Sequence, residues 1–476
     1  MNQLLTPLAD ALRSQAQSSY VPFDVPGHKG GLEPLAEYFG NDLLLLDKNS
    51  RASIDYLCHP LSVIREAQDL AAEAFGAKNA FFMIGGTTSS VQAMVMSACA
   101  PGEKIILPRN VHYSVINAVI LAGAVPLYIA PQVHSRIGIS LGMQVDDVLE
   151  CIEKHPEAKA ILINNPTYYG ICSALEKIVE LAHEHNMLVL VDEAHGTHFY
   201  FGDNLPKGAM HCGADLSSVS MHKTGGSLTQ SSILLSNGKL SEAHIENIIN
   251  LTRSTSASYL LLASLDLARQ YLVTKGRSVL NRNLNNICKT RAEINAIGGY
   301  YAFGEECIDG DSIFDFDLSK LSINTIGIGL AGIEVYALLR DEYGIQLEFG
   351  DTANVLALST LGDREGDNEK LVEALVDIKK KYGTPSSHRF SYEYITPTPI
   401  ISPRDAFYAA KKSKPIGECV GEICGDAVMC YPPGIPILAP GELITDEIVQ
   451  HIVYASQKGC SVTGLDANGE VLVVSH

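Results

Sequence analysis

The stretch "MLVLVDEAHGTH", residues 187–198, is apolar through Val191 and becomes polar at Asp192 and Glu193. A short apolar run of this kind predicts a buried strand whose carboxyl end carries acidic side chains. Side chains alternate along extended chain, so Asp192 and Ala194 should face the same way. A carboxylate and a methyl group could then meet the same bound ring, the carboxylate at a ring nitrogen and the methyl on a ring face.

Similar apolar runs recur from about residue 78 onward, separated by Gly, Pro and Asn loops and by segments with helical spacing. One such segment places Val91, Met94, Val95 and Ala98 on one helix face. Strands alternating with helices predict a doubly wound, mostly parallel sheet from residue 52 to about 260, with ligands beyond the carboxyl ends of its strands. The predicted strands are 80–84, 104–108, 125–130, 159–164, 187–192, 216–220 and 231–236.

The remainder of the chain predicts further domains. A helical stretch over 258–297 should lead out of the large domain, and residues 313–380 have the pattern strand, strand, helix, strand, helix. The tail is rich in prolines and turns. We expect an α/β protein with an N-terminal arm (1–51), a large domain (52–300), a smaller α/β domain (301–388) and a C-terminal domain (389–476).

Composition limits the classes of partner. The 476 residues carry a net charge of -19, which would repel nucleic acid or an anionic membrane and would suit a small cationic substrate. Eleven cysteines, an odd number without a disulfide framework, indicate a reducing compartment, and we expect the cytoplasm. We expect no membrane span or leader peptide, because no apolar run approaches the roughly 20 residues of a membrane helix.

The sequence "GGTTSS", residues 85–90, follows the first predicted strand and begins a helix. Gly85 and Gly86 permit close approach of a ligand to the backbone, and Thr87, Thr88 and Ser89 supply hydroxyls. Helix-start amides and the helix dipole favour a phosphate at such a place. A plain helix cap after a glycine turn is the alternative.

Lys223 lies in "SMHKTGGSLTQSS", residues 220–232, just after a predicted strand. The glycines of a phosphate-binding P-loop are missing before it, so nucleotide hydrolysis is not expected. By itself it could be an ordinary surface lysine. Together with the "GGTTSS" turn and Asp192, it has the setting that a Schiff base with pyridoxal phosphate requires.

Other interpretations have weaker support. Asp192, His195 and His198 could bind a metal, but they match no recognised ligand spacing, and we expect no metal. The stretch "GIGLAG", residues 327–332, is formally a dinucleotide motif with Glu348 and Asp351 downstream. The spacing of Cys419, Cys424 and Cys430 fits no common zinc or iron–sulfur site.

An ordered series of motifs resembles the Orn/Lys/Arg decarboxylase family of fold type I pyridoxal-phosphate enzymes, above all its short bacterial arginine/lysine decarboxylases. The resemblance covers nearly the whole chain and implies an aminotransferase-like fold. The motifs are "FDVPGHKGG", "AQDLAAEAFGA", "PRNVHYS", "NNPTYYG", "VDEAHGTHF", "HKTGGSLTQSS", "STSASYLLLASLD", "SPRDAFYA" and "YPPGIPILAPGE".

The resemblance implies a role for each site residue. Lys223 would form the Schiff base, Asp192 would pair with the pyridinium nitrogen, and either Lys223 or His222 would protonate the substrate Cα. His112 would stack on one ring face and Ala194 on the other, with His195 just beyond the ring. The cofactor phosphate would be held by hydroxyl and histidine side chains of Thr87, Thr88, Ser89, Ser220 and His222, and the phosphate of a neighbouring subunit by Ser254, Thr255 and Ser256.

The implied reaction is decarboxylation of a basic L-amino acid in a homodimer or larger homo-oligomer, with arginine to agmatine ahead of lysine to cadaverine or ornithine to putrescine. Transamination by the same cofactor and a non-catalytic regulatory paralogue are the alternatives. The sequence departs from the family at Tyr113, where Lys is common, and at Glu422 and Asp426, where a basic residue and Glu are usual. His28 and Lys29 of "PGHKG" form a structural turn or reach a neighbouring site.

Overall fold

The computed structural model describes residues 1–384, 395–431, 434–457 and 460–475. The chain divides into two compact units. Unit 1 comprises Met1–Ser97 and Leu190–Asn281, and unit 2 comprises Ala98–Val189 and Arg282–His476. The four-part division expected from the sequence stays a prediction, and its boundary at residues 388 and 389 lies outside the described residues.

A seven-stranded sheet has the order β1-β8-β7-β6-β4-β2-β3. It contains every strand predicted for the large domain: β1 (Asn79–Met83), β2 (Lys104–Pro108), β3 (Val125–Ile129), β4 (Ala160–Asn164), β6 (Leu188–Asp192), β7 (Leu216–Val219) and β8 (Ser232–Ser236). Strand β2 pairs in parallel with β3 and β4, and β6 pairs in parallel with β7. The prediction of a mostly parallel α/β sheet is therefore confirmed.

Strand β8 departs from the parallel pattern, because it runs antiparallel to both β1 and β7. Between β7 and β8 the chain forms only the one-turn helix α9 (Met221–Thr224), which is too short to act as a crossover helix. Strand β1 therefore runs parallel to β7. The carboxyl ends of β1, β6 and β7 consequently lie at the same edge of the sheet in unit 1.

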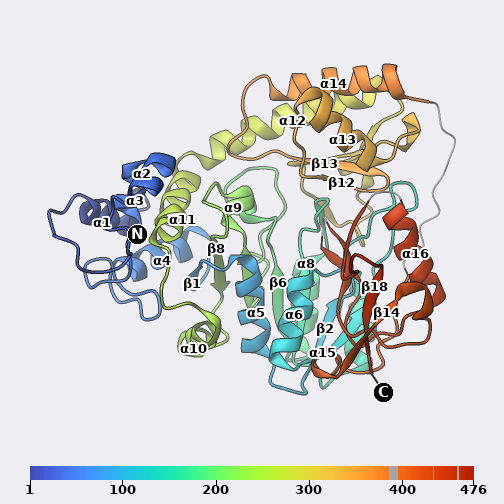
Figure 1. Cartoon of the computed structure of the whole chain (residues 1–476), viewed down its shortest axis with the longest axis horizontal. Helices are drawn as coiled ribbons and strands as arrows, with labels where there is room; N and C mark the ends of the chain where they lie inside the picture. The colour runs from blue at the N-terminus through green and yellow to red at the C-terminus, as the bar shows by residue number, and fades with distance from the viewer. Residues whose placement is uncertain (385–394, 432–433, 458–459, 476) are drawn as a thin grey trace. The chain divides into compact units, whose positions relative to one another are not determined.

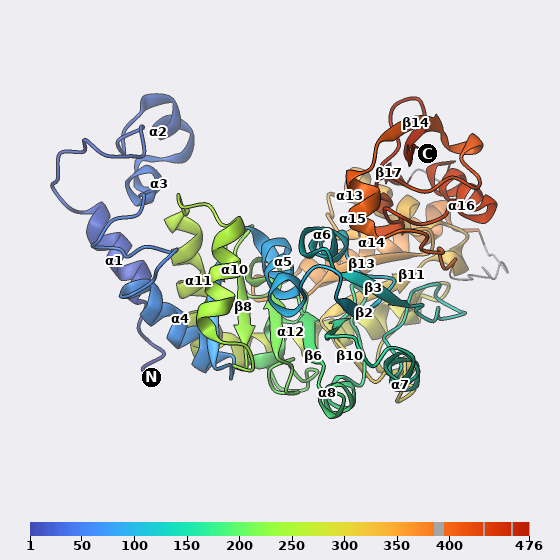
Figure 2. The ribbon, with the colours of Figure 1, turned by 90° about the horizontal axis from the view of Figure 1, so that it is seen from below.

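The helices of unit 1 surround this part of the sheet. Figure 2 shows α2 and α3 next to each other, and α1 beside α4 and α11. The buried carboxylate of Asp266 accepts hydrogen bonds from the amides of Leu8 and Ala9 at 3.0 and 3.3 Å, which holds the start of α1 on α11. The helices are α1 (Pro7–Ala16), α2 (Glu33–Phe39), α3 (Asn41–Leu46), α4 (Val63–Ala74), α5 (Gly86–Ala98), α10 (Glu242–Thr252), α11 (Tyr259–Tyr271) and the 3-10 turn η1 (Thr197–Tyr200).

In unit 2, a four-stranded antiparallel sheet has the order β12-β13-β11-β9 and is covered by α12, α13 and α14 (Figure 1). Its core contains Ile294, Ile323, Leu339, Val355 and Leu375, all fully buried. The order predicted for 313–380 is thus confirmed, with two strands where one was expected. These elements are β9 (Tyr301–Ala302), β10 (Asp315–Phe316), β11 (Lys320–Asn324), β12 (Phe349–Gly350), β13 (Asn354–Leu358), α12 (Arg277–Ile297), α13 (Gly332–Tyr343) and α14 (Asp367–Tyr382).

The rest of unit 2 includes three helices of the large sheet and a C-terminal layer. The helices are α6 (Tyr113–Ala122), α7 (Val145–Lys154) and α8 (Leu175–Glu184), with β5 (Ile171–Cys172) pairing with β10. The C-terminal layer has a two-stranded and a three-stranded sheet around a core that includes Val428, Leu438 and Ile448. Its elements are α15 (Pro403–Tyr408), β14 (Lys411–Pro415), β15 (Val428–Tyr431), β16 (Ile435–Leu438), α16 (Asp446–Gln457), β17 (Ser461–Thr463) and β18 (Glu470–Val474).

The helices of the described ranges are too short or too polar to span a bilayer.

Candidate active site

Three segments predicted to carry chemistry meet at the carboxyl edge of unit 1. They are the turn before α5, the end of β6, and the segment from Ser220 through α9. The hydroxyls of Thr87 and Ser220 are hydrogen-bonded to each other, and the amide of Gly86 donates to the Gln230 carbonyl at 2.8 Å. In the β6–β7 register, Asp192 lies opposite Ser218. Parallel strands place these segments together, as the sequence predicts.

The turn before α5 has room for an anion. Gly86 adopts a φ of +69°, and a Cβ built on it would meet no atom within 4 Å, so the space in front of it is open. A Cβ on Gly85 would lie 1.9 Å from the Ser89 Oγ, which itself donates to the Gly85 carbonyl at 3.1 Å. Thr88 is exposed. Open space beside helix-start amides and hydroxyls suits a phosphate group.

Lys223 lies in α9, and its Nζ is 2.9 Å from the Nε2 of His195. His195 is only 4% exposed, in the turn that follows β6. The family resemblance leaves Lys223 and His222 as alternative proton donors to the substrate Cα. The structure instead places the Nδ1 of His222 2.9 Å from the Ser231 carbonyl, to which it donates. Burial, together with the charge of Lys223, lowers the pKa of His222.

Asp192 is buried at the last position of β6 and accepts a hydrogen bond from the Ala194 amide at 3.2 Å. Ala194 lies beyond the strand, so its direction is set by this turn and not by strand alternation. The carboxylate remains at the strand end, where the sequence predicts it. Its pairing with a ring nitrogen stays a prediction.

Glu193 is a member of the site region to which sequence reasoning gave no role. It is fully buried, and its carboxylate accepts from Ser217 Oγ at 2.7 Å, Tyr200 OH at 2.7 Å and the Ala209 amide at 2.8 Å. Burial raises its pKa to about 7. These partners are distant in sequence, so no local pattern reveals the network that supports the end of β6.

The predicted phosphate-binding residues Ser254, Thr255 and Ser256 are exposed in the loop between α10 and α11. Arg253, which the sequence did not single out, holds this loop. It donates to the carbonyls of Leu57 at 2.7 Å and Phe82 at 3.2 Å. The loop is therefore tied to the end of β1 while its hydroxyl side chains face solvent.

His112 belongs to unit 2, where it caps the start of α6. Its Nδ1 accepts the Ser114 amide at 3.1 Å and lies 2.8 Å from the Ser114 Oγ. The imidazole is therefore held by its own helix. Its predicted stacking on a cofactor ring stays a prediction.

Two of the three departures from the family pattern lie near each other in unit 2. Burial, together with the nearby Asp426 carboxylate, raises the pKa of Tyr113. Glu422 instead pairs with Lys414 at 2.9 Å and Lys412 at 3.5 Å on β14. Tyr113 and Asp426 are therefore neighbours, whereas Glu422 pairs with lysines of β14.

The alternatives from the sequence gain no support. Within the described ranges, no cluster of three His, Cys, Asp or Glu side chains is arranged to hold a metal ion. In "GIGLAG", a Cβ on Gly327 would lie 2.3 Å from the Gly299 carbonyl oxygen, and one on Gly332 would lie 2.0 Å from that of Asn354. Backbone packing in unit 2 requires glycine at these two positions.

Two cysteine thiols of the tail and the "PGHKG" turn also make local contacts. The Sγ of Cys419 donates to the Pro415 carbonyl at 3.1 Å, and that of Cys424 to the Asp426 carbonyl at 2.7 Å. His28 accepts the Gly30 amide at 3.0 Å and lies 3.1 Å from Asp47.

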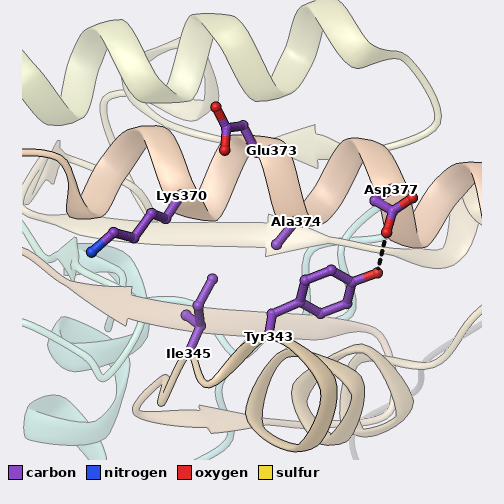
Figure 3. Close-up of a pocket in the computed structure, with 6 residues that line it drawn as sticks. All are labelled: Tyr343, Ile345, Lys370, Glu373, Ala374 and Asp377. Atoms are coloured by element: carbon purple, nitrogen blue, oxygen red, sulfur yellow. Dashed lines mark hydrogen bonds between the residues drawn. The ribbon is translucent and has the colours of Figure 1, made fainter.

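A pocket of about 350 Å³ lies between the end of α13 and α14, and Figure 3 shows its side chains. None of them belongs to the predicted site. The Tyr343 hydroxyl donates to Asp377 at 2.7 Å, and Lys370 and Glu373 also line the opening.

Residues 6–367 match the major domain of Orn/Lys/Arg decarboxylases, and residues 387–467 match their C-terminal domain. The chain belongs to the Orn/Lys/Arg decarboxylase family. It is 42% identical over 471 residues to an arginine decarboxylase of Bacillus subtilis (strain 168), an alignment that covers 98% of this chain and 96% of that protein.

Solved structures agree on the fold of this decarboxylase. A constitutive lysine decarboxylase of E. coli matches with a TM-score of 0.84 at 20% identity, over 100% of this chain and 82% of that one. An alanine–glyoxylate aminotransferase from Nostoc matches with a TM-score of 0.54 at 17% identity, over 68% of this chain and 88% of that one. The aminotransferase-like fold implied by the motifs is confirmed.

Family membership makes the chain an amino-acid decarboxylase that acts on a basic substrate, in a family of pyridoxal-phosphate enzymes. The expectation of this enzyme class from Lys223, Asp192 and the "GGTTSS" turn is therefore confirmed at the level of the family. The roles of the individual residues stay predictions.

Proposed function

We propose that the chain is a pyridoxal-phosphate-dependent arginine decarboxylase that forms agmatine and carbon dioxide. The identity of 42% with the Bacillus subtilis arginine decarboxylase, over nearly the full length of both chains, supports the choice of arginine. The chemistry is supported by three segments that meet at one sheet edge: the turn at residues 85–89, the strand end with Asp192, and the segment from Ser220 to Lys223.

The residues at this edge suit pyridoxal phosphate. The open space before Gly86 and the hydroxyls of α5 fit its phosphate, the Asp192 carboxylate fits its ring nitrogen, and the Lys223 amine fits its aldehyde. When bound, this cofactor supplies a protonated ring that accepts the electron pair left at Cα as carbon dioxide departs. A carboxylate in a buried site favours protonation of that ring nitrogen, because it stabilises the positive charge.

Lys223 and His195 form the proton-handling pair in this proposal. With its Nζ 2.9 Å from His195 Nε2, Lys223 can pass a proton to the imidazole and regain it. The contact favours Lys223 as the donor to Cα, with His195 as its relay. His222 is held at its Nδ1 by the Ser231 carbonyl and is assigned, with Ser220, Thr87, Thr88 and Ser89, to the cofactor phosphate.

We also propose a homodimer with a shared active site, located in the cytoplasm. The exposed hydroxyls of Ser254, Thr255 and Ser256 support a contact with a partner's cofactor phosphate. Large apolar side chains of the N-terminal arm that are exposed in the single chain, including Phe23 at 95% and Tyr38 at 82%, support burial against a second copy. An odd number of cysteines fits a reducing compartment.

Borohydride reduction of the purified holoenzyme tests the cofactor assignment. Peptide mass analysis should find reduced pyridoxal phosphate on Lys223, and Lys223→Ala should lose both the label and carbon dioxide release. A Lys223→Ala protein with wild-type activity and cofactor spectrum would contradict the proposal.

A substrate panel tests the reaction. Carbon dioxide release should be fastest with arginine, ahead of lysine and ornithine. A faster reaction with either competitor would reassign the substrate. A keto-acid product without carbon dioxide would indicate transamination, and no turnover of any amino acid would indicate a regulatory paralogue.

A further inference from the structure

The turn at residues 193–196 connects β6 to η1 within unit 1 and carries His195. The amide of Glu193 donates to the Ser218 carbonyl at 3.0 Å, so the start of the turn is tied to the end of β7. The Gly196 amide donates to the Glu193 carbonyl at 2.9 Å and closes the turn. The position of the His195 imidazole therefore depends on how this short turn is held.

The Glu193 carboxylate holds the segments that surround the turn. Its Oε2 accepts from Ser217 Oγ of β7 and from Tyr200 OH of η1, both at 2.7 Å, and its Oε1 accepts the Ala209 amide at 2.8 Å. The Tyr200 hydroxyl in turn accepts the Met210 amide at 3.1 Å. One buried carboxylate thus ties η1 to β7 and to the loop that precedes β7.

These hydrogen bonds order the turn at a cost in stability. Glu193 is fully buried, and burial disfavours its charged form more than the three hydrogen bonds favour it. A well-packed apolar side chain of similar volume would avoid this cost. The carboxylate provides geometry, because its two oxygens bind donors from three separate segments at fixed distances.

Thr197 ties the other end of the turn to the segment that carries Lys223. Its Oγ1 donates to the Ser220 carbonyl at 3.1 Å, and the Lys223 amide donates to the same carbonyl at 3.1 Å. Thr197 is fully buried, and its Cγ2 lies 2.9 Å from the place that a Cβ on Gly225 would occupy. The first residue of η1 is therefore in contact with both ends of α9.

We propose that Glu193 and Thr197 are positioning residues for His195. Together they keep its imidazole 2.9 Å from the Lys223 amine, since Glu193 holds the turn to the sheet and Thr197 holds it to α9. This inference rests on the proposed function, because it takes Lys223 and His195 as the pair that handles the proton. Both positioning residues act through His195.

The variant Thr197→Val removes the bond to Ser220 with little change in side-chain volume. It should lower kcat about fivefold, the effect of one hydrogen bond, and leave the KM for arginine within about twofold of the wild-type value. Thr325→Val is the matched control, because Thr325 is also fully buried and its Oγ1 donates to the Leu330 carbonyl at 2.8 Å in unit 2. The control should lose unfolding free energy and keep the wild-type kcat.

A double-mutant cycle separates positioning from a general structural role. In a His195→Gln background, Thr197→Val should lower kcat by no more than about 1.5-fold further, because the group that it positions is already absent. Full multiplication of the two single effects would overturn the proposal. A wild-type kcat in the single variant Thr197→Val would overturn it as well.

The variant Tyr200→Phe tests the hold of Glu193 on η1. It removes one of three donors to the carboxylate, so kcat should fall about threefold. Tyr343→Phe removes the same kind of bond, to Asp377 in the pocket of Figure 3, and should leave kcat unchanged. Equal kcat in these two variants would overturn the role of Glu193.

Substitutions of Glu193 itself test whether geometry or charge matters. Glu193→Gln keeps the length of the side chain and can still accept the Ala209 amide, so its kcat should stay within about twofold of the wild type. Glu193→Leu accepts none of the three hydrogen bonds, and its kcat should fall at least about tenfold. Equal kcat in the two variants would contradict a positioning role.

A measurement without cofactor distinguishes failure of this proposal from failure of the proposed function. In cofactor-free protein, hydrogen exchange of the amides at residues 194–196 should accelerate in Thr197→Val and not in Thr325→Val. Equal exchange in both variants would overturn the positioning role even where Lys223 binds the cofactor. Absence of the borohydride label on wild-type Lys223 would instead reject the proposed function.

Discussion

At the scale of single residues, Glu193 shows how burial changes the behaviour of an ordinary side chain. Its neighbour Asp192 is the last residue of β6, and Glu193 follows it, fully buried, where two hydroxyls and an amide donate to its carboxylate. The hydrogen bonds favour the charged form, and burial opposes it more strongly, so its pKa rises to about 7. Glu193 therefore couples folding to pH.

The sign of this coupling follows from the raised pKa. The folded protein holds a proton that the unfolded chain releases above its ordinary pKa of 4.5, so stability falls as pH rises from there to about 7. Glu193→Gln cannot ionise, and its unfolding free energy should lack this loss of roughly 3 kcal/mol. Urea denaturation of cofactor-free protein across this pH window measures the difference. The control Glu369→Gln, at an exposed position, should show the same pH dependence of unfolding free energy as the wild type. If Glu193→Gln also showed the wild-type pH dependence, the loss of stability could not be assigned to Glu193.

At the scale of elements, the start of α5 illustrates why a helix end needs a particular backbone to bind an anion. The left-handed φ of Gly86 turns the chain into the helix, and its missing side chain leaves open space before the first amides. Gly102 has a similar φ of +85° and equally open surroundings, but it lies in the loop before β2. The two glycines share a conformation and differ in what they face.

Alanine substitution at these glycines should separate backbone strain from ligand binding. Both Gly86→Ala and Gly102→Ala should lose about 1–2 kcal/mol of unfolding free energy, the cost of a side chain in the left-handed region. Only Gly86→Ala should weaken binding of pyridoxal phosphate, by about tenfold or more, because its methyl group enters the space proposed for the phosphate. Spectroscopic titration of cofactor-free protein decides this. Equal losses of cofactor affinity in the two variants would place the phosphate elsewhere.

At the scale of the whole molecule, the N-terminal arm is held in place at helix α1 and exposes large apolar side chains after it. Helix α1 is held by Asp266, whereas Tyr20, Val21, Phe23 and Tyr38 are each at least 76% exposed. Such a concentration of exposed apolar side chains is typical of a surface that is covered in the assembled protein. A second copy of this chain is the proposed cover.

Charges placed on the arm should therefore disrupt assembly. The double variant Phe23→Asp, Tyr38→Asp should shift sedimentation toward the monomer and lower kcat at least tenfold, since the shared sites would be lost. Val376→Asp, which charges a 47% exposed position on α14, should leave the oligomer intact. A wild-type chain that sediments as a monomer with full activity would reject the dimer.

Much of this protein was determined by its sequence alone. Apolar runs that end at Leu107 and Val191 predict the strands, because a short buried strand is recognised from its local hydrophobicity. The "GGTTSS" turn and Lys223 predict a pyridoxal-phosphate site, because glycines and hydroxyls suit a phosphate and a lysine after a strand end can form a Schiff base. The sequence predicted strand β8 but not its antiparallel direction, which follows from the short connection between β7 and β8.

Only the tertiary structure decided which side chains meet. The His195 imidazole lies 2.9 Å from the Lys223 amine, Glu193 accepts hydrogen bonds from Tyr200 and Ser217, and Arg109 pairs with Glu442 more than 300 residues away. Local patterns record the burial and conformation of a residue and carry no information about a partner brought near by folding. The physical reason is that hydrophobic burial is non-directional, so the pattern of apolar residues along the chain is enough to predict it. A hydrogen bond needs a specific partner at a specific distance, and the fold brings that partner into place.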